Sequence, residues 1–456
     1  MTISKRVSRH SYLRLISVSV LVVLASSCNE ITDTQLPDGV EGPSTYNNRQ
    51  GAIRLTQATQ NKLSTAIRNY IIESGLLSDE LGGAAFDMRS GQQIAFPPHQ
   101  VRSLARLARG VIGKYVEGET SAWQARLLMY EGYAEILTAD GWCSGVPLST
   151  LDFEGDWTYK PGSTTDQIYE HAIILLDSAD SRAKDSLQLV SAIRVLKARA
   201  YLALGRYADA RQAVQGIVDD FQFDLRIAFD AGVSRQAEIP QYDEFLIRAS
   251  ISDNEGKNGL PYLSSNDPRT DAVQLQSSVG GPGVLSFFPR KYLTVGDSSI
   301  FILSSGIESK LIIAETALHE NNAQRMMVIL NTLRTSGSYT IDTTELTEGG
   351  ERIDTLWHPG GGGVSGLRPL DTPVTFEAQR KLLFSERAAW LFLTGSRQGD
   401  LRRLVRKYGV NQAQVYPTGV YTAANGTLDV YGNDISFSLH SSEFINPLFK
   451  GCQYDE

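Results

Sequence analysis

Apolar residues recur at helical spacing along most of the chain, and the clearest case is the stretch 190–221. It contains two apolar faces with i, i+3, i+4 spacing, one on each side of Gly205. Gly205 stands where the C-terminus of a helix favours a left-handed residue. The residues on the two faces are Ala198, Tyr201, Leu202, Ala210, Val214 and Ile217. We therefore predict two helices joined by a tight turn, with Ala198 and Ala210 allowing their backbones to approach closely.

The segment KARAYLALGRYADARQAVQGI within this stretch resembles one tetratricopeptide unit. One such unit cannot bury its own apolar face, so further hairpins should stack on it. The same periodicity predicts helices over 51–73, 103–117, 121–138, 164–180, 307–318, 323–334, 376–394 and 399–408. Loops and short strands are expected over 222–300, and the alternating runs 428–431 and 435–439 could pair as strands. The fold class predicted is mainly α: tetratricopeptide-like helical hairpins forming an α-α superhelix, with long loops and a few short β-strands.

Two sequence patterns indicate helix N-termini directly. Ser121 is followed three residues later by Gln124, and Thr164 is followed by Gln167. Each pair has the spacing of a capping box, in which the side chains of the two residues satisfy each other's backbone N–H groups. We therefore predict that helices start at both places.

The N-terminus reads as an export signal. Basic residues precede a short apolar run over 15–24, which is too short to span a bilayer. Ala25, Ser26 and Ser27 then precede Cys28, and this ending resembles the lipobox of bacterial lipoproteins. We predict a lipoprotein signal peptide over 1–27, lipidation of Cys28, a flexible tether over 28–50 and a single helical domain over 51–456. The alternative is an ordinary secretory signal with a chance cysteine.

Charge and cysteine content exclude some classes of protein. The net charge of −8 argues against nucleic acid as a main partner, because phosphate binding needs clustered basic residues. Three cysteines exclude a disulfide-dense scaffold and a cysteine-rich zinc site. Once Cys28 is lipidated, Cys143 and Cys452 remain in an oxidising compartment, which favours a disulfide between them. The alternative is two buried free thiols.

No catalytic or metal-binding pattern stands out. The six histidines make no H-x-x-x-H or H-E-x-x-H motif, and no nucleophile elbow, P-loop or dinucleotide-binding loop is present. Asp152, Glu154 and Asp156 crowd one loop, but their spacing does not show two carboxylates facing each other across a scissile bond. We expect a protein that is not an enzyme and has no cofactor or metal. The alternative is a secreted hydrolase on a helical-repeat scaffold, using loop carboxylates such as Glu154 and Asp156.

Four features in this order resemble the SusD/RagB family of outer-membrane nutrient-binding lipoproteins. They are the lipobox, the segment GLLSDEL with the later DGWCSGVPLS loop, Lys291-Tyr292 followed by LIIAETA, and SERAAWLFLTGSRQGDLRRL, with EFINP near the end. The chain departs from the family pattern at Trp390 and Thr394, where acids are usual, and at Ser396. The resemblance implies a lipid-anchored protein on the outer membrane that faces the cell exterior. It implies a nutrient polymer, glycan or peptide, as ligand and a TonB-dependent barrel transporter as partner.

Charged residues of the SERAAWLFLTGSRQGDLRRL segment have spacings that allow mutual ion pairs at a helix junction. We expect a structural role for them rather than ligand binding. They are Glu386, Arg387, Arg397 and Asp400.

Aromatic residues in loops are the candidate ligand contacts, because a flat apolar ring can stack on a sugar. Trp123 and Trp390 fall within helical patterns and are expected in the core. The candidates lie beside glycine, proline or acidic residues in three loops, 82–99, 141–162 and 336–374. They are Phe86, Trp142, Trp157, Tyr159 and Trp357. The alternative for each is a loop aromatic that covers the helical core.

Overall fold

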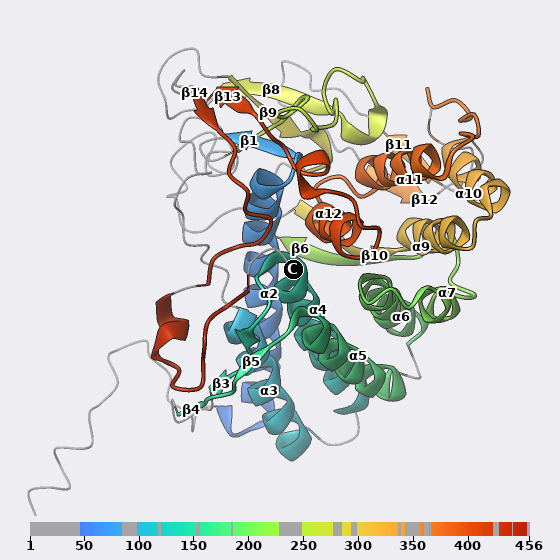
Figure 1. Ribbon diagram of the computed structural model, residues 1–456. Helices are drawn as coiled ribbons and strands as arrows, with labels where there is room; N and C mark the ends of the chain where they lie inside the picture. Colours follow the sequence, from blue (N-terminus) through green and yellow to red (C-terminus); the bar gives the residue numbers. More distant parts are fainter. Residues whose placement is uncertain are drawn as a thin grey trace, which may run out of the picture.

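Helices form most of the structure (Figure 1), which confirms the mainly α class. The computed structural model describes residues 46–83, 98–116, 120–151, 156–183, 186–227, 249–276, 285–292, 299–335, 339–342, 356–359, 364, 366–422, 428–439 and 441–453. The α-helices in these ranges are α2 (Arg49–Leu77), α3 (Pro98–Tyr115), α4 (Thr120–Gly141), α5 (Thr165–Arg182), α6 (Leu187–Ala203), α7 (Tyr207–Ala213), α9 (Gly306–His319), α10 (Ala323–Thr335), α11 (Phe376–Trp390) and α12 (Ser396–Arg406).

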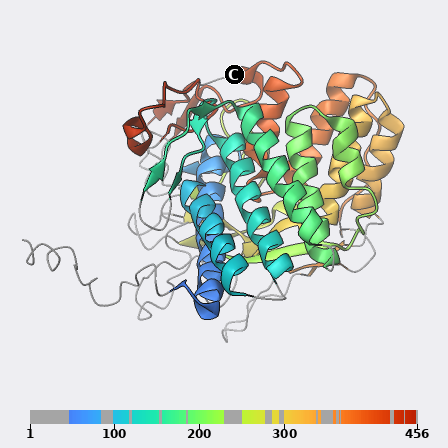
Figure 2. The same ribbon diagram turned by 90° about the horizontal axis from the view of Figure 1, so that it is seen from below.

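The helices from α2 to α10 follow one another across the molecule in chain order. Figure 2 shows this row from α2, in blue, to α10, in orange, and each helix packs on the next. Small residues allow the close approach: a Cβ atom on Gly132 of α4 would lie 3.0 Å from the side chain of Leu176 on α5. Stacking of consecutive hairpins buries their apolar faces, as expected of repeats that cannot fold singly.

The hairpin over 190–221 forms as predicted at its turn and departs from the prediction at its end. Gly205 is left-handed, with φ of 77°, and Ala198 and Ala210 are fully buried between the helices. However, α7 ends at Ala213 and does not reach Ile217. The chain turns through Gly216, which also has a positive φ of 80°, and enters a strand. Glycine adopts this conformation at no steric cost, so the turn is favoured over a longer helix.

One of the two predicted capping boxes is confirmed. The Thr164 hydroxyl accepts from the Gln167 N–H at 3.2 Å, and the Gln167 side chain accepts from the Thr164 N–H at 2.9 Å. The box at Ser121 is wrong, because α4 already begins at Thr120. The Ser121 hydroxyl instead donates to the Arg182 carbonyl at 2.6 Å. The Ser121 side chain, which the local pattern predicts to cap α4, therefore makes a tertiary contact with the end of α5 instead.

The strands form antiparallel pairs outside the helical row. The pairs are β1 (Leu81–Gly83) with β7 (Ala249–Ile251), β2 (Val146–Pro147) with β5 (Gly162–Ser163), β3 (Thr150–Leu151) with β4 (Trp157–Thr158), β6 (Gln222–Ile227) with β10 (Ser299–Ser305), β8 (Ala272–Gln276) with β9 (Leu285–Pro289), β11 (Tyr339–Asp342) with β12 (Leu356–Pro359), and β13 (Val420–Thr422) with β14 (Leu428–Val430). The expected pairing of 428–431 with 435–439 is wrong. β14 pairs with β13, and residues 435–439 enter the core, where Ile435, Phe437 and Leu439 are buried.

The last two α-helices, α11 and α12, pack against helices from earlier in the chain. α11 packs on α9, and α12 packs on both α2 and α4. The Arg402 guanidinium of α12 donates to the carbonyl oxygens of Ala139, Asp140 and Trp142 at 2.7, 3.2 and 2.8 Å, which satisfies the C-terminal end of α4. Within the described ranges, no helix is long and apolar enough to cross a lipid bilayer.

Candidate functional site

The β3–β4 hairpin projects from the helical row, and a buried arginine fixes its base. The side chain of Arg102, on α3, is 2% exposed and pairs with Glu135 of α4 at 2.8 Å. Its two terminal nitrogens donate to the carbonyl oxygens of Ser149 at 3.1 Å and Leu148 at 3.3 Å, just before β3. The Ser149 hydroxyl then accepts from the Lys160 N–H beyond β4 at 3.1 Å. The hairpin is therefore held in place by two helices of the scaffold.

The hairpin presents two aromatic side chains, Trp157 and Tyr159. They are two residues apart, so they project from the same face of the extended chain. Trp157 is 41% exposed and Tyr159 is half-buried. Their ring centroids lie 6.3 Å apart and their planes differ by 9°. Two nearly parallel rings on this hairpin form an aromatic surface on which a flat apolar ligand face can stack.

The C-terminal segment 441–449 lies against the same hairpin (Figures 1 and 2). The Asn446 amide nitrogen donates to the Lys160 carbonyl at 2.9 Å and to the Ser149 hydroxyl at 3.3 Å. Phe444 and Ile445 are each 68% exposed. Segment 441–449 therefore carries exposed apolar side chains and is hydrogen-bonded to the base of the hairpin.

A disulfide holds this end of the chain to the helical body. It joins Cys143, just after α4, to Cys452, with a Cα–Cα distance of 5.7 Å. Beside it, Ser144 and Gln453 exchange two backbone hydrogen bonds at 2.8 and 2.7 Å. The bridge and this short ladder place segment 441–449 beside the hairpin.

Trp142 does not belong to this surface, so its prediction as a ligand contact is wrong. It is 3% exposed and lies between Tyr70 of α2 and Phe437, with ring centroids 6.2 and 5.1 Å away. The physical reason is the returning tail, which covers the end of α4 and buries the indole. Trp390 is also buried, as expected, and Trp123 packs half-buried against the core.

Several other sequence predictions fall outside the part of the chain that the structure describes. Cys28, Phe86, Asp152 and Glu154 lie in ranges that are not described. Trp357 lies on β12 opposite Ile341 of β11, and nothing is described of its side chain. Asp156 is exposed beside Trp157. In the described ranges, no group of three or more histidine, cysteine, aspartate or glutamate side chains could hold a metal ion.

The charged motif residues of α11 and α12 form buried ion pairs, but the predicted mutual pairing holds only for Arg387 and Asp400. The Glu386 carboxylate accepts from Arg269 at 2.7 Å and from Arg334 at 2.6 Å. Arg397 forms a bidentate ion pair with Asp79, with N–O distances of 2.6 and 2.8 Å. Bidentate pairs of this kind fix the relative orientation of the two side chains as well as their distance. They join α11 and α12 to the end of α2 and to the segment before β8.

The turn between α11 and α12 explains why the predicted helix 376–394 ends early, at Trp390. Leu393 has a positive φ of 49°, which is strained for a leucine and which ends the helical conformation. Three side chains hold this turn: Glu80 accepts from the Leu393 N–H at 2.7 Å, the Tyr292 hydroxyl donates to the Leu393 carbonyl at 2.6 Å, and Lys291 donates to the Phe392 carbonyl. Burial raises the pKa of Glu80 and lowers that of Lys291. The GLLSDEL, Lys291-Tyr292 and TGSRQGD segments therefore meet at one structural junction.

Comparisons with known proteins identify the fold. NanU of B. fragilis is 14% identical and aligns over 91% of this chain and 99% of its own, with a TM-score of 0.58. A SusD-like protein from Bacteroides fragilis NCTC 9343 has the same identity and coverage, with a TM-score of 0.56. A SusD-like carbohydrate-binding protein from Bacteroides vulgatus ATCC 8482 is 13% identical and aligns over 88% of this chain and 97% of its own, with a TM-score of 0.52. No protein-family model and no curated protein sequence matches the chain. The chain has the SusD-like fold, and the resemblance stated from its motifs is confirmed at that level.

Proposed function

We propose that this protein is a cell-surface lipoprotein that captures a nutrient glycan and delivers it to a TonB-dependent barrel transporter in the outer membrane. The observation that carries the glycan part is the exposed, nearly parallel pair of Trp157 and Tyr159 on a hairpin held by the scaffold. The fold of the chain supports glycan binding, because a protein described as SusD-like and carbohydrate-binding has the same fold. The proposal includes no catalytic step.

Binding to such a surface depends on aromatic stacking and neutral hydrogen bonds. We expect Trp157→Ala to raise the Kd for the cognate glycan by about tenfold or more, which corresponds to a loss of about 1.4 kcal/mol or more. The measurement is affinity electrophoresis against a panel of polysaccharides, followed by calorimetry with the best ligand. Salt should have little effect on this Kd, because no charged ligand group is needed.

The matched control is Phe376→Ala. Phe376 is 40% exposed, close to the 41% of Trp157, but it lies at the start of α11 and not on the hairpin. We expect its replacement to leave glycan binding unchanged. If Trp157→Ala and Tyr159→Ala together bind the glycan as tightly as the wild type, the hairpin is not the ligand surface. Binding of peptides alone, in a parallel peptide panel, would overturn the glycan assignment.

Membrane attachment is proposed to depend on Cys28, in the lipobox-like sequence at the end of the signal. Stable anchoring requires more than one acyl chain. The bacterial lipoproteins that this N-terminus resembles carry three acyl chains. Metabolic labelling with a fatty acid should mark the wild type, and Cys28→Ala should lose the label and leave the membrane fraction. Equal labelling of the two proteins would contradict lipidation at this residue.

The delivery step is proposed because a tethered capture protein raises the local concentration of a large ligand at a barrel mouth. The predicted tether, 28–50, would serve this role up to the start of α2 at Arg49. We expect the protein to co-purify with a barrel transporter from outer membranes solubilised in mild detergent, and its deletion to abolish uptake of the cognate glycan. If it emerges alone and uptake of every tested polymer is unchanged by the deletion, the delivery role is wrong, whatever the outcome of the binding experiment.

A further inference from the structure

A chain of three side chains connects the surface of α5 to the base of the β3–β4 hairpin. Nδ1 of His171, on α5, lies 2.6 Å from Oε2 of Glu135, and the other carboxylate oxygen accepts from Nε of Arg102 at 2.8 Å. The two terminal nitrogens of Arg102 donate to the carbonyl oxygens of Ser149 and Leu148, directly before β3. The Glu135 carboxylate therefore links a histidine on one helix to the arginine that fixes the hairpin.

His171 is the member of this chain that protons from solvent can reach. The exposed fraction of the side chain is 38% for His171, 0% for Glu135 and 2% for Arg102. A guanidinium keeps its charge at physiological pH, whereas a histidine changes its charge near neutrality. Because a carboxylate only accepts hydrogen bonds, Nδ1 of His171 is the donor in both charge states, and an added proton goes to Nε2. Proton uptake therefore changes the charge at one end of the chain and leaves its hydrogen bonds in place.

The charges around His171 favour its protonated form. The hydrogen bond to Glu135 raises the pKa of His171 most, burial and Arg102 lower it, and Glu131, one turn before Glu135 on α4, raises it, so that this pKa lies above its ordinary value. The other charged groups along α5 and the elements packed against it have partners of their own. They are Arg106 and Arg109 of α3 with Glu131, Arg194 and Lys197 of α6 with Asp180 and Asp177, Arg206 with Glu170, and Arg406 and Lys407 at the end of α12 with Asp166.

We propose that His171 is a positioning residue for the surface formed by Trp157 and Tyr159, and that its positive charge strengthens the hold of the helices on the hairpin. Charged, it holds the Glu135 carboxylate by a charge-assisted hydrogen bond, which is about twice as strong as a neutral one. A carboxylate held in this way keeps Arg102 directed at the carbonyl oxygens before β3. When His171 loses its proton, this hydrogen bond weakens and the base of the hairpin is held less firmly. The effect on affinity rests on the glycan-binding function proposed above.

The affinity for the glycan should therefore fall as the pH rises. A histidine whose folded pKa is raised gives its full contribution below the unfolded value, about 6.5, and loses it as the pH rises through the folded value. The loss is partial, because Arg102 keeps its charge and its hydrogen bonds. We expect the Kd to rise by about two- to fivefold between pH of about 6 and about 9, the size of effect that exchanging a charged for a neutral hydrogen-bond donor produces.

Fluorine NMR of the intact protein, labelled with fluorotryptophan, tests the positioning role without any ligand. The signal of Trp157 is assigned by its absence from the spectrum of Trp157→Phe. We expect this signal to shift with pH, with a midpoint above about 6.5. In His171→Gln, which keeps a neutral donor at this place, the signal should stay constant. A wild-type signal that does not change over this range overturns the proposal, and so does a shift that persists in His171→Gln.

His319→Gln is the matched control. His319 is an exposed histidine at the end of α9, stacked on Tyr207 with ring centroids 3.9 Å apart, and it is not part of the chain that leads to the hairpin. We expect the Trp157 signal of this variant to shift with pH as in the wild type. A constant signal in His319→Gln would overturn the assignment of the transition to His171.

Calorimetry with the cognate glycan then separates the positioning role from the proposed function. The Kd should rise with pH in the wild type and in His319→Gln, and it should be independent of pH in His171→Gln. A wild-type Kd that does not change with pH overturns the effect on affinity. If no glycan binds at any pH while the Trp157 signal still follows His171, the positioning role stands and the glycan-binding function fails.

Discussion

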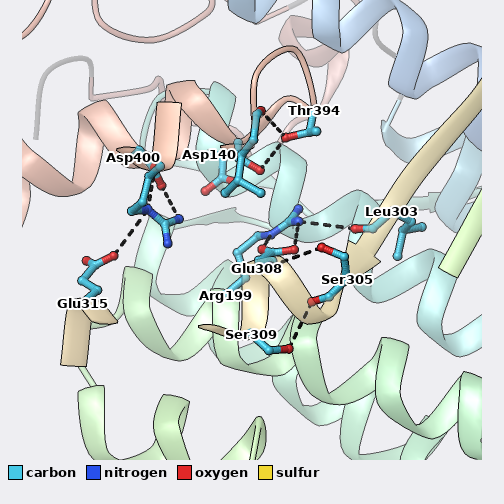
Figure 3. Close-up of polar contacts among 12 residues, drawn as sticks. Asp140, Arg199, Leu303, Ser305, Glu308, Ser309, Glu315, Thr394 and Asp400 are labelled. Atoms are coloured by element: carbon cyan, nitrogen blue, oxygen red, sulfur yellow. Dashed lines mark hydrogen bonds and ion pairs between the residues drawn. The ribbon is translucent and has the colours of Figure 1, made fainter. Parts of the chain in front are cut away.

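Replacing Asp400 with asparagine is expected to lower the free energy of unfolding by about 3–5 kcal/mol, because it leaves an uncompensated buried charge. The Asp400 side chain is 4% exposed and accepts from Arg387 twice, at 2.8 Å each, and from Arg403 at 2.9 Å. Glu315 pairs with Arg403 at 2.6 and 2.8 Å and lies 3.6 Å from Arg387. Two carboxylates and two guanidinium groups thus form a neutral cluster that joins α9, α11 and α12, part of which is seen in Figure 3.

The stabilisation that the ionised Asp400 carboxylate provides should be lost at low pH. Burial alone would raise the pKa of Asp400, but Arg387 and Arg403 outweigh burial and lower it to about 2. The unfolded value is about 3.9. A carboxyl group with a depressed folded pKa stabilises the fold fully above the unfolded value and loses its contribution as the pH falls through the folded value. The stability difference between wild type and Asp400→Asn should therefore be complete at neutral pH and shrink as the pH approaches 2.

The matched control for this prediction is Asp166→Asn. Asp166 also contacts two cations of the same helix region, Arg406 at 3.2 Å and Lys407 at 3.6 Å, but its side chain is 49% exposed. Exposed pairs contribute about 0–1 kcal/mol, so the control should unfold close to the wild-type denaturant midpoint. Urea unfolding with an unchanged m-value measures both effects. Equal midpoints for the two variants would show that the buried cluster adds no more than a surface pair.

Local sequence signals predicted the helical part of this fold well. The periodicity identified each stacked hairpin, and Gly205 and the Thr164 capping box marked real boundaries. The failures lie where distant residues decide the local conformation. The helix expected to reach Thr394 ends at Trp390 because Glu80, Lys291 and Tyr292 hold the next residues in a turn. No periodicity within the helix could reveal those partners.

In the candidate site too, local signals identified some residues, and distant contacts decided the position of others. Trp157 and Tyr159 could be picked out as loop aromatics because their neighbours in the sequence are polar and turn-forming. Trp142 had the same local appearance, yet Phe437 and Tyr70 cover it, and burial by a returning tail has no signal in the adjacent sequence. Arg102 and Glu135, which fix the base of the hairpin, were also missed, since their pair joins residues 33 apart in the chain. Pairing at such separations is a property of the packed fold and not of a sequence pattern.

Removal of the Cys143–Cys452 bridge is the other large effect that we expect. Changing both cysteines to serine should lower the free energy of unfolding by about 2–5 kcal/mol, because the bridge closes a loop across a sequence separation of 309 residues and restricts the unfolded chain. Thiol titration of unfolded, unreduced wild type should find neither of these two thiols free. Two free thiols in that titration would rule the bridge out.

The bridge should also affect the ligand surface, and this effect separates it from a purely stabilising crosslink. The hydrogen bonds of Asn446 to Lys160 and Ser149 hold segment 441–449 against the hairpin, and the bridge holds the end of that segment. The double serine variant should therefore bind the cognate glycan more weakly even at temperatures where it is fully folded. Reduction of the wild type should reproduce both losses, whereas reduction of the double variant should change neither. A double variant with the wild-type denaturant midpoint and the wild-type Kd would show that the tail is held without the bridge, by its hydrogen bonds and by the burial of Phe437 beside Trp142.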